Sequence, residues 1–269
     1  MITSNDNEKL KLVRKLGQKK HRRKLGMFVT EGEDLARAGL AAGAIPRALL
    51  IHPDLEGTDL GAAGETVEPD LLERASALGS GTRAIGIWPQ AGADRPGREA
   101  EVGPGEGSVR LDGVCVYLDR LSDPGNVGTI VRTVDALLEA TVVAGPGTAD
   151  HYSPGAVRAS MGSIFTQPVV RAGIAATPEP RIATVPRGGD RPGPHPAPVT
   201  ICLGAEREGL SPEILNMCDA RWTIPLRAGG AESLNVAAAA AVVCERISSP
   251  AAPATGGPDG TAQTGNGNG

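Results

Sequence analysis

The order of hydrophobic and polar positions divides the first part of the chain into alternating strands and helices. Short apolar runs at residues 27–29, 48–53 and 83–88 predict three strands. Apolar positions recur at helical spacing over residues 32–42 and 68–78, which predicts a helix in each segment. We therefore expect a small α/β domain over residues 1–88.

The same alternation begins again in the second half. Apolar runs predict further strands at residues 113–119, 141–145, 200–204 and 221–226. Helices are predicted at residues 127–138, from Pro154 with Ser153 as its cap, and at 236–247, a run of alanine and aliphatic residues. This alternation predicts a mostly parallel sheet over residues 110–247, with ligands at the carboxyl ends of its strands.

Two segments have the composition of irregular chain. Residues 89–109 and 248–269 are rich in Pro and Gly, so we expect a linker and a disordered tail. No apolar run approaches 18 residues, and the first residues lack the apolar core of a signal peptide. Four widely spaced cysteines favour neither a zinc site nor a disulfide framework. We expect a cytoplasmic protein without a membrane span or a metal.

The positive charges of the chain are concentrated in one segment near its start. The net charge of -4 does not indicate a nucleic-acid partner, but residues 9–24 contain nine of the 27 lysines and arginines and no acid. This basic segment is expected to be helical with its cations in water. It either contacts RNA or is simply a solvated face. The residues assigned to RNA contact are Lys19, Lys20, Arg22, Arg23 and Lys24.

Three polar clusters follow strands of the second domain. LDRLSDPGNVGTIVRT places Asn126 at an expected helix N-cap and Arg132 inside that helix. LGAEREGLSPEIL places Glu206 just after a strand, and Ser233 and Asn235 precede the alanine helix. Each cluster taken alone also has a purely structural interpretation. The first is a capped surface helix, the second an exposed loop carboxylate, and the third a pair of residues that cap a helix. Taken together, they predict a ligand site at one edge of the sheet.

Several kinds of site are disfavoured by the residues present. The P-loop pattern G-x-x-x-x-G-K-[ST] is absent, and Gly145-Pro146-Gly147 is too little for a dinucleotide fingerprint. A nucleotide-binding oxidoreductase is therefore disfavoured. The four histidines belong to no matching motif and are interpreted as ordinary surface or loop residues.

Three motifs, in order along the chain, resemble those of the SpoU (TrmH-type) RNA ribose methyltransferases of the SPOUT superfamily. They are D-P-G-N-V-G-T-I-V-R-T at 123–133, L-G-A-E-R-E-G-L-S at 203–211 and I-P-L-x6-S-L-N-V-A at 224–237. The resemblance implies an α/β fold with a C-terminal trefoil knot, an exception to the rule that chains are unknotted. It also implies S-adenosylmethionine as cofactor, methylation of a ribose 2′-hydroxyl in RNA, and a homodimer whose subunits complete each other's active sites.

The resemblance also implies roles for individual residues. The cofactor cleft is expected to be formed by Leu203, Gly204, Glu206, Gly209, Ile224, Leu226, Ser233 and Leu234. The catalytic positions are Asn126, Arg132, Glu206, Ser233 and Asn235. Arg132 either takes the proton of the hydroxyl or clamps a phosphate. The chain departs from the family pattern at Ala205 and Arg207, where members commonly carry Asn and Gly.

The first domain adds a preference for the substrate. R-x-x-G-M-F-V-T-E-G-E-D-L-A-R-A-G-L-A-A-G, with the later strands, resembles the N-terminal substrate-binding domain of the family's ribosomal RNA members, which is akin to a ribosomal protein. This favours 23S ribosomal RNA, in housekeeping or in antibiotic self-resistance. A transfer-RNA 2′-O-methyltransferase and a non-catalytic RNA-binding protein of the same fold remain alternatives.

Overall fold

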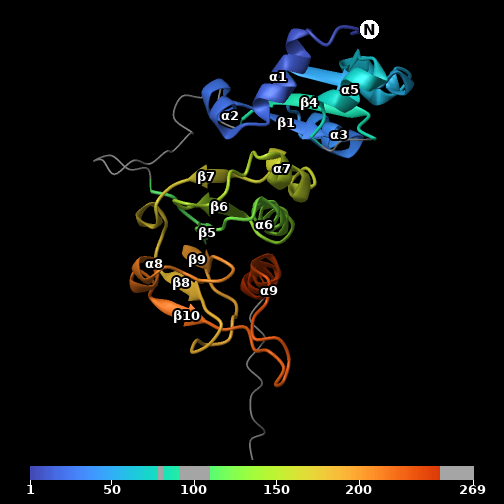
Figure 1. Cartoon of the computed structure of the whole chain (residues 1–269). Helices are drawn as coiled ribbons and strands as arrows, with labels where there is room; N and C mark the ends of the chain where they lie inside the picture. Colours follow the sequence, from blue (N-terminus) through green and yellow to red (C-terminus); the bar gives the residue numbers. More distant parts are fainter. Residues whose placement is uncertain (78–80, 91–109, 249–269) are drawn as a thin grey trace, which may run out of the picture.

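The computed structural model describes residues 1–77, 81–90 and 110–248, which form two α/β units around two sheets (Figure 1). The first sheet has the strand order β1-β4-β2-β3, with β4 antiparallel to both β1 and β2 and β3 parallel to β2. Its elements are α1 (Glu8–Leu16), α2 (Lys19–Leu25), β1 (Met27–Glu31), α3 (Glu33–Ala41), β2 (Ala48–Ile51), η1 (Pro53–Leu55), α4 (Asp59–Ala63), β3 (Glu65–Thr66), α5 (Pro69–Ala75) and β4 (Ala84–Pro89).

The basic segment forms two helices instead of one. α1 ends at Gly17, and α2 ends at Gly26, whose φ of 60° is the left-handed conformation that glycine adopts freely. α1 buries Leu10, Val13 and Leu16 against the first sheet, because these positions recur every three residues along one face.

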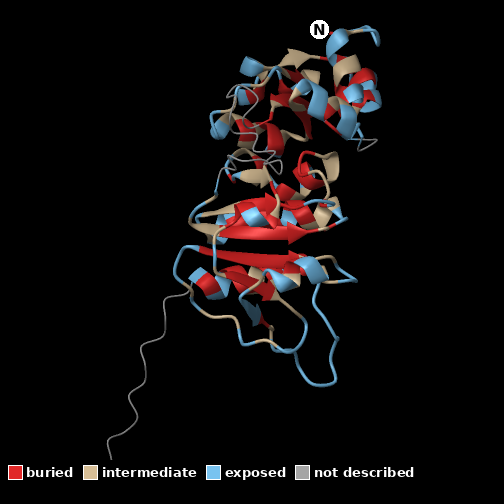
Figure 2. Cartoon of the chain, turned by 90° about the vertical axis from the view of Figure 1, so that its left-hand side faces the viewer, coloured by how far each residue is buried: buried red, intermediate tan, exposed pale blue. Residues whose placement is uncertain are grey.

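The second sheet consists of six parallel strands in the order β10-β8-β9-β5-β6-β7. The alternating pattern predicts the parallel pairing and four of these strands. In Figure 1 its helices α6, α7 and α9 lie on one side and α8 on the other, and Figure 2 shows the central strands buried. The elements are β5 (Val114–Asp119), α6 (Pro124–Leu137), β6 (Ala140–Ala144), α7 (Pro154–Ser160), η2 (Ser163–Phe165), β7 (Val169–Arg171), η3 (Ile174–Ala176), β8 (Arg181–Thr184), β9 (Val199–Gly204), α8 (Pro212–Asn216), β10 (Ala220–Trp222) and α9 (Val236–Ser248).

Some predicted boundaries are wrong. β7 and β8 were not predicted, because each is short and β8 lies within a Pro- and Gly-rich stretch. The strand predicted at 221–226 ends at Trp222, and Asp123, not Asn126, is the N-cap of α6. Pro89 belongs to β4 and Ser248 to α9.

Other expectations are not tested by the described residues. The remainder of the expected linker (91–109) and of the expected tail (249–269) lies outside them. The trefoil knot likewise stays a prediction. None of the helices in residues 1–77, 81–90 and 110–248 is long and apolar enough to cross a membrane.

The two units meet at an apolar junction that contains most of the aromatic residues. The chain has two Trp, two Tyr and two Phe. Four of them meet here: Phe28 and Trp88 from the first sheet, and Tyr152 and Phe165 from the segments around α7. The ring centroids of Phe28 and Tyr152 are 4.8 Å apart, and those of Trp88 and Phe165 are 4.9 Å apart. Aromatic rings bury large areas, so the first domain is docked on the second.

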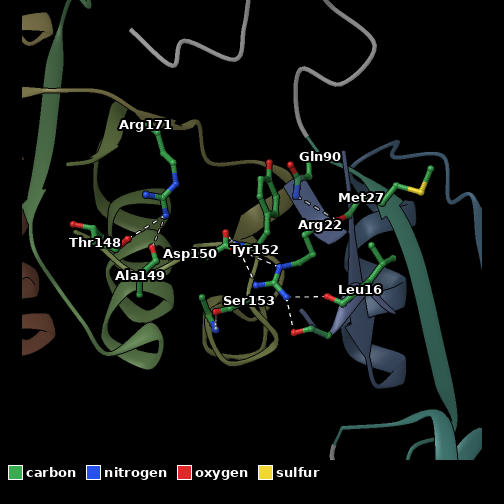
Figure 3. Close-up of polar contacts among 12 residues, drawn as sticks. Leu16, Arg22, Met27, Gln90, Thr148, Ala149, Asp150, Tyr152, Ser153 and Arg171 are labelled. Atoms are coloured by element: carbon green, nitrogen blue, oxygen red, sulfur yellow. Dashed lines mark hydrogen bonds and ion pairs between the residues drawn. The ribbon is translucent and has the colours of Figure 1, made fainter. Parts of the chain in front are cut away.

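A buried ion pair lies beside these rings (Figure 3). The guanidinium of Arg22 donates from Nε and Nη2 to Asp150 Oδ2 at 3.0 and 2.7 Å, and from Nη1 to the carbonyls of Leu16 and Gly17 at 2.8 Å each. Arg22 is only 3% exposed. The expectation that this arginine lies in water and contacts RNA is therefore wrong. Lys19, Lys20, Arg23 and Lys24 are exposed on α2.

The pKa of Asp150 reflects two opposing influences. Burial acts to raise the pKa of this carboxyl, but the hydrogen bond and the positive charge of Arg22 outweigh it, so the pKa lies below its usual range. The stabilisation from this group is present above the unfolded-state pKa of about 4 and is lost as the pH falls through the lower folded pKa.

We predict that Asp150→Ala will lower the free energy of unfolding by about 3–5 kcal/mol at neutral pH, because the buried Arg22 then lacks a counter-charge. Denaturant unfolding followed by tryptophan fluorescence measures the loss. Asp59→Ala is the matched control, since it removes an exposed pair with Arg37 and should change stability very little. Equal losses in the two variants would contradict the structural role of the buried pair.

Candidate active site

The loop after β9 is held in a tight, closed shape. The Ala205 N–H donates to the Gly209 carbonyl at 3.1 Å, and the Gly209 N–H donates to the Ala205 carbonyl at 2.9 Å. Gly209 has a φ of +69°, and a Cβ on Gly204 would lie 2.2 Å from the carbonyl carbon of Gly209. Both glycines are therefore required by the backbone. The closing contacts use only the backbone of Ala205, so its departure from the family pattern leaves the loop closed.

A cavity of about 320 Å³ lies against this loop, at the carboxyl ends of β8 and β9. One wall is apolar, with Leu210, Leu215 and Val236 among its side chains, and the rim carries Glu206, Arg207 and Glu208. All eight residues assigned to the cofactor cleft line it: Leu203, Gly204, Glu206, Gly209, Ile224, Leu226, Ser233 and Leu234. Two of its side chains, Leu226 and Leu234, are exposed large hydrophobics. A concave, mostly apolar site with a few polar groups is typical of a small-molecule pocket.

The three sequence motifs meet in one chain of hydrogen bonds at the edge of this cavity. Asn126 Nδ2 donates to Glu206 Oε1 at 2.8 Å, and Asn235 Nδ2 donates to Asn126 Oδ1 at 3.1 Å. The Asn126 amide is thereby held at both ends. Asn235 Oδ1 in turn accepts from the backbone N–H of Ala237 at 2.9 Å and so caps α9.

Two of the predicted catalytic residues lie apart from this chain of hydrogen bonds. Ser233 is exposed and lines the cavity, but it makes no hydrogen bond to the described part of the protein, so Asn235 alone caps α9. Arg132 is exposed on α6 and has no partner among the described residues. It lies about 9 Å along the helix from Asn126 and about 120° around it. Within one chain, Arg132 does not meet the other motif residues.

Sequence reasoning missed Arg120, at the end of β5. Arg120 Nη1 donates to Glu208 Oε2 at 2.9 Å, which ties the loop after β5 to the loop after β9. The adjacent Asp119 is buried and accepts from the Ser211 N–H at 2.7 Å, at the start of α8. The position of Arg120 just after a strand was the available signal, but its partner depends on which strands are neighbours.

In the part of the chain that the structure describes, no three His, Cys, Asp or Glu side chains come together in a way that could hold a metal ion.

Comparison with known proteins identifies the architecture. Residues 113–245 match the SpoU rRNA Methylase family, and residues 7–78 match the MRM3-like substrate binding domain. The solved structure of an AdoMet-bound rRNA methyltransferase from Sinorhizobium meliloti is 31% identical, covers 90% of this chain and 95% of that one, and has a TM-score of 0.72. The chain belongs to the SpoU rRNA methylase family.

Two further relatives of this SpoU-family chain have named activities or ligands. The SpoU methyltransferase AviRb from Streptomyces viridochromogenes, solved in complex with AdoMet, is 25% identical over 89% of this chain and 96% of that one, with a TM-score of 0.71. The 23S rRNA (guanosine(2553)-2′-O)-methyltransferase RlmP of Bacillus subtilis is 32% identical over 63% of this chain. That alignment spans 64% of the length of RlmP.

We predict that Asn235→Ala will lower the free energy of unfolding by about 1 kcal/mol, the usual value of a helix N-cap. Asn235→Ser should retain most of this stability, because serine also caps helices well. Denaturant titration of the two variants measures the difference. Equal stability losses would show that the side chain does not stabilise α9 by capping.

Proposed function

We propose that this protein is an S-adenosylmethionine-dependent methyltransferase that methylates a ribose 2′-hydroxyl in 23S ribosomal RNA in the cytoplasm. The observation that carries the proposal is the Asn126–Glu206–Asn235 hydrogen-bond chain beside the cavity. The relatives support it, since RlmP is named for this reaction on 23S rRNA and AviRb was solved with AdoMet. The match of residues 7–78 to a substrate-binding domain also supports an RNA substrate.

The cavity residues fit this cofactor. The apolar wall, which includes Leu203, Ile224 and Leu226, suits the adenosine, and Gly204 lets the backbone approach it closely. The charged rim suits an amino-acid group that carries both a carboxylate and an ammonium. When bound there, the cofactor supplies a methyl group on a sulfonium, ready for transfer to an oxygen nucleophile.

The residues of this chain orient the acceptor. The 2′-hydroxyl oxygen forms a bond to the methyl carbon as the carbon–sulfur bond breaks, which leaves a neutral thioether. The hydroxyl proton passes to water, because Glu206 and Asn235 are exposed at the edge of the cavity. Asn126 has a second amide N–H beyond the one it donates to Glu206, and this donor is left for an oxygen of the ribose. Because Glu206 and Asn235 fix the amide at both ends, the donor is pre-oriented, and such positioning accounts for much of the rate enhancement of many enzymes.

Arg132 is proposed to act on the RNA backbone. An arginine stays protonated at all pH values that proteins tolerate, so it is an awkward base. Its planar fork of N–H donors matches a phosphate in a bidentate contact. We therefore favour the phosphate clamp over the alternative in which Arg132 takes the hydroxyl proton.

The position of Arg132 favours a homodimer. It is exposed on α6 and far from Asn126 within one chain. Ala237 and Ala240 of α9 are buried against their own chain, while Ala238 is exposed beside them. Small side chains let a neighbouring backbone approach closely, so this face of α9 is suited to a second copy. A two-fold dimer would then supply Arg132 from the partner subunit, as the family resemblance implies.

We predict that Arg132→Ala and Asn235→Ala will each abolish methyl transfer as homodimers, while cofactor binding persists in Arg132→Ala. Co-expression of the two variants should restore about a quarter of the wild-type rate, because half of the dimers are mixed and each of these has one intact site. Methyl transfer to RNA by the purified mixture measures the recovery.

Two controls make this complementation test specific. Arg132→Lys should remain poor, because a point charge does not reproduce the fork of donors. Sedimentation velocity should show a dimer for the wild type and for both variants. An inactive mixture, or an active wild-type monomer, would contradict a site shared between subunits.

The exposed cations of α2 are the proposed RNA contacts. Because the first domain is docked through the aromatic junction, α2 is held in place relative to the cavity. We predict that the salt dependence of RNA affinity will flatten when Lys19, Lys20, Arg23 and Lys24 are replaced by Gln. Each lost phosphate contact should reduce the slope of log K against log salt by about 0.7–0.9.

Filter binding over a range of salt concentrations measures this slope. Arg37→Gln with Arg83→Gln is the control, because these arginines lie outside α2 and pair with acids of the first domain. Cofactor affinity should stay at the wild-type value in both sets. An unchanged slope in the α2 variant would indicate a merely solvated face.

Mapping of 2′-O-methyl groups tests the function as a whole. Ribosomal and transfer RNA from cells with and without the protein are compared at nucleotide resolution. A new methyl group in 23S rRNA supports the proposal. A new methyl group in transfer RNA alone would favour the alternative substrate, and none in any RNA would favour a non-catalytic RNA-binding protein.

A further inference from the structure

Three consecutive charged residues occupy the tip of the loop after β9, and their surroundings differ. Glu206 accepts from Asn126 at 2.8 Å, and Glu208 accepts from Arg120 at 2.9 Å. Arg207, between them, is exposed and has no hydrogen bond or ion pair with the described part of the chain. It lines the cavity.

Arg207 also stands out among the residues that line the cavity. It is the only lysine or arginine of that lining within the described residues, and Glu206 and Glu208 are the only acids. The backbone beneath it is fixed, because Ala205 and Gly209 close the loop with two hydrogen bonds. The guanidinium is therefore attached to a rigid base at the rim of an otherwise largely apolar cavity.

The charges of the cofactor named in the proposed function are complementary to such a cation. S-adenosylmethionine carries two positive groups, an ammonium and a sulfonium, and one negative group, the α-carboxylate. The two acids of the rim attract the positive groups but repel the carboxylate. An unpaired arginine between these acids offsets that repulsion and presents a planar fork of donors that matches a carboxylate.

We propose that Arg207 binds the α-carboxylate of the cofactor and makes the cavity selective for adenosine sulfonium and thioether ligands that carry an amino-acid group. The inference rests on the proposed function, since it concerns the same cavity. It goes beyond that function by giving a role to a residue that departs from the family pattern.

Binding of two ligands can be compared to isolate the contribution of the carboxylate from that of the rest of the cofactor. S-adenosylhomocysteine and 5′-methylthioadenosine share the adenosine and the thioether, but only the first has the α-carboxylate. We expect Arg207→Ala and Arg207→Gly to lower the binding affinity for S-adenosylhomocysteine about tenfold or more. This is the effect expected from the loss of one charge-assisted hydrogen bond. The affinity for 5′-methylthioadenosine should stay unchanged. Isothermal titration calorimetry of the full-length protein measures both.

Matched variants control for general effects of charge. Arg227→Ala removes another exposed arginine, in the loop before α9, that does not line the cavity, and it should change neither affinity. Arg207→Lys should recover part of the lost affinity. RNA affinity of the Arg207 variants, measured by filter binding, should equal that of the wild type.

The outcomes distinguish this inference from the function on which it rests. If the wild type binds both ligands but Arg207→Ala binds S-adenosylhomocysteine normally, the carboxylate contact is wrong and the cofactor assignment stands. A loss of RNA affinity without a loss of ligand affinity would indicate that Arg207 contacts a phosphate of the RNA, and this result would overturn the inference. If the wild type binds neither ligand, the proposed function fails, and the inference fails with it.

Discussion

The parallel pairing of β5 with β9 determines where the motif residues of the candidate site can be. Its register runs from Val114 opposite Val199 to Asp119 opposite Gly204, so both strands end at the same level of the sheet. The loops that follow must therefore begin side by side. One leads into α6, whose first turn carries Asn126, and the other carries Glu206, so their side chains meet although 80 positions separate them. The Arg120–Glu208 ion pair joins the same two loops.

Close packing of helices under this edge completes the site. Gly128 allows α6 to approach α7 closely, since a Cβ there would lie 2.1 Å from the carbonyl oxygen of Ala156. On its other side α6 packs against α9, where Ala237 and Ala240 share the core with Val127 and Val131. Small residues at both contacts bring the amino ends of α6 and α9 together. That proximity is what lets Asn235 cap α9 and bond to Asn126 with one side chain.

The docking of the first domain has a different physical basis. This chain contains few aromatic residues, yet most of them lie at one junction, next to a buried ion pair. Large rings provide apolar area with few rotatable bonds, and a buried charge pair tolerates little displacement. The junction therefore fixes the orientation of the first sheet relative to the cavity, which a flexible tether would not do. In the proposed function, this fixed distance between α2 and the cavity serves to select a nucleotide within a large folded RNA.

Local pattern was sufficient for most of the secondary structure, and the family resemblance named the residues expected to line one cleft. The helix that begins at Pro154 has its cap at Ser153, as the sequence indicates, and α9 begins at Val236. The eight expected cleft residues all line one cavity, because motif residues after strand ends converge at one edge of a parallel sheet. The short strands β7 and β8 escaped prediction, since their few residues are held by neighbouring strands more than by their own pattern.

Only the tertiary structure decided the partners of charged residues. Arg22 lies among exposed lysines in the sequence, and its burial depends on Asp150, which is 128 positions away in another domain. Arg120 likewise finds Glu208 only because β5 and β9 are neighbours. The sequence around a charged residue does not indicate whether the fold will place an opposite charge beside it. Hydrophobic periodicity is a local property that a short segment already carries, whereas the pairing of charges depends on which distant segments the fold places together.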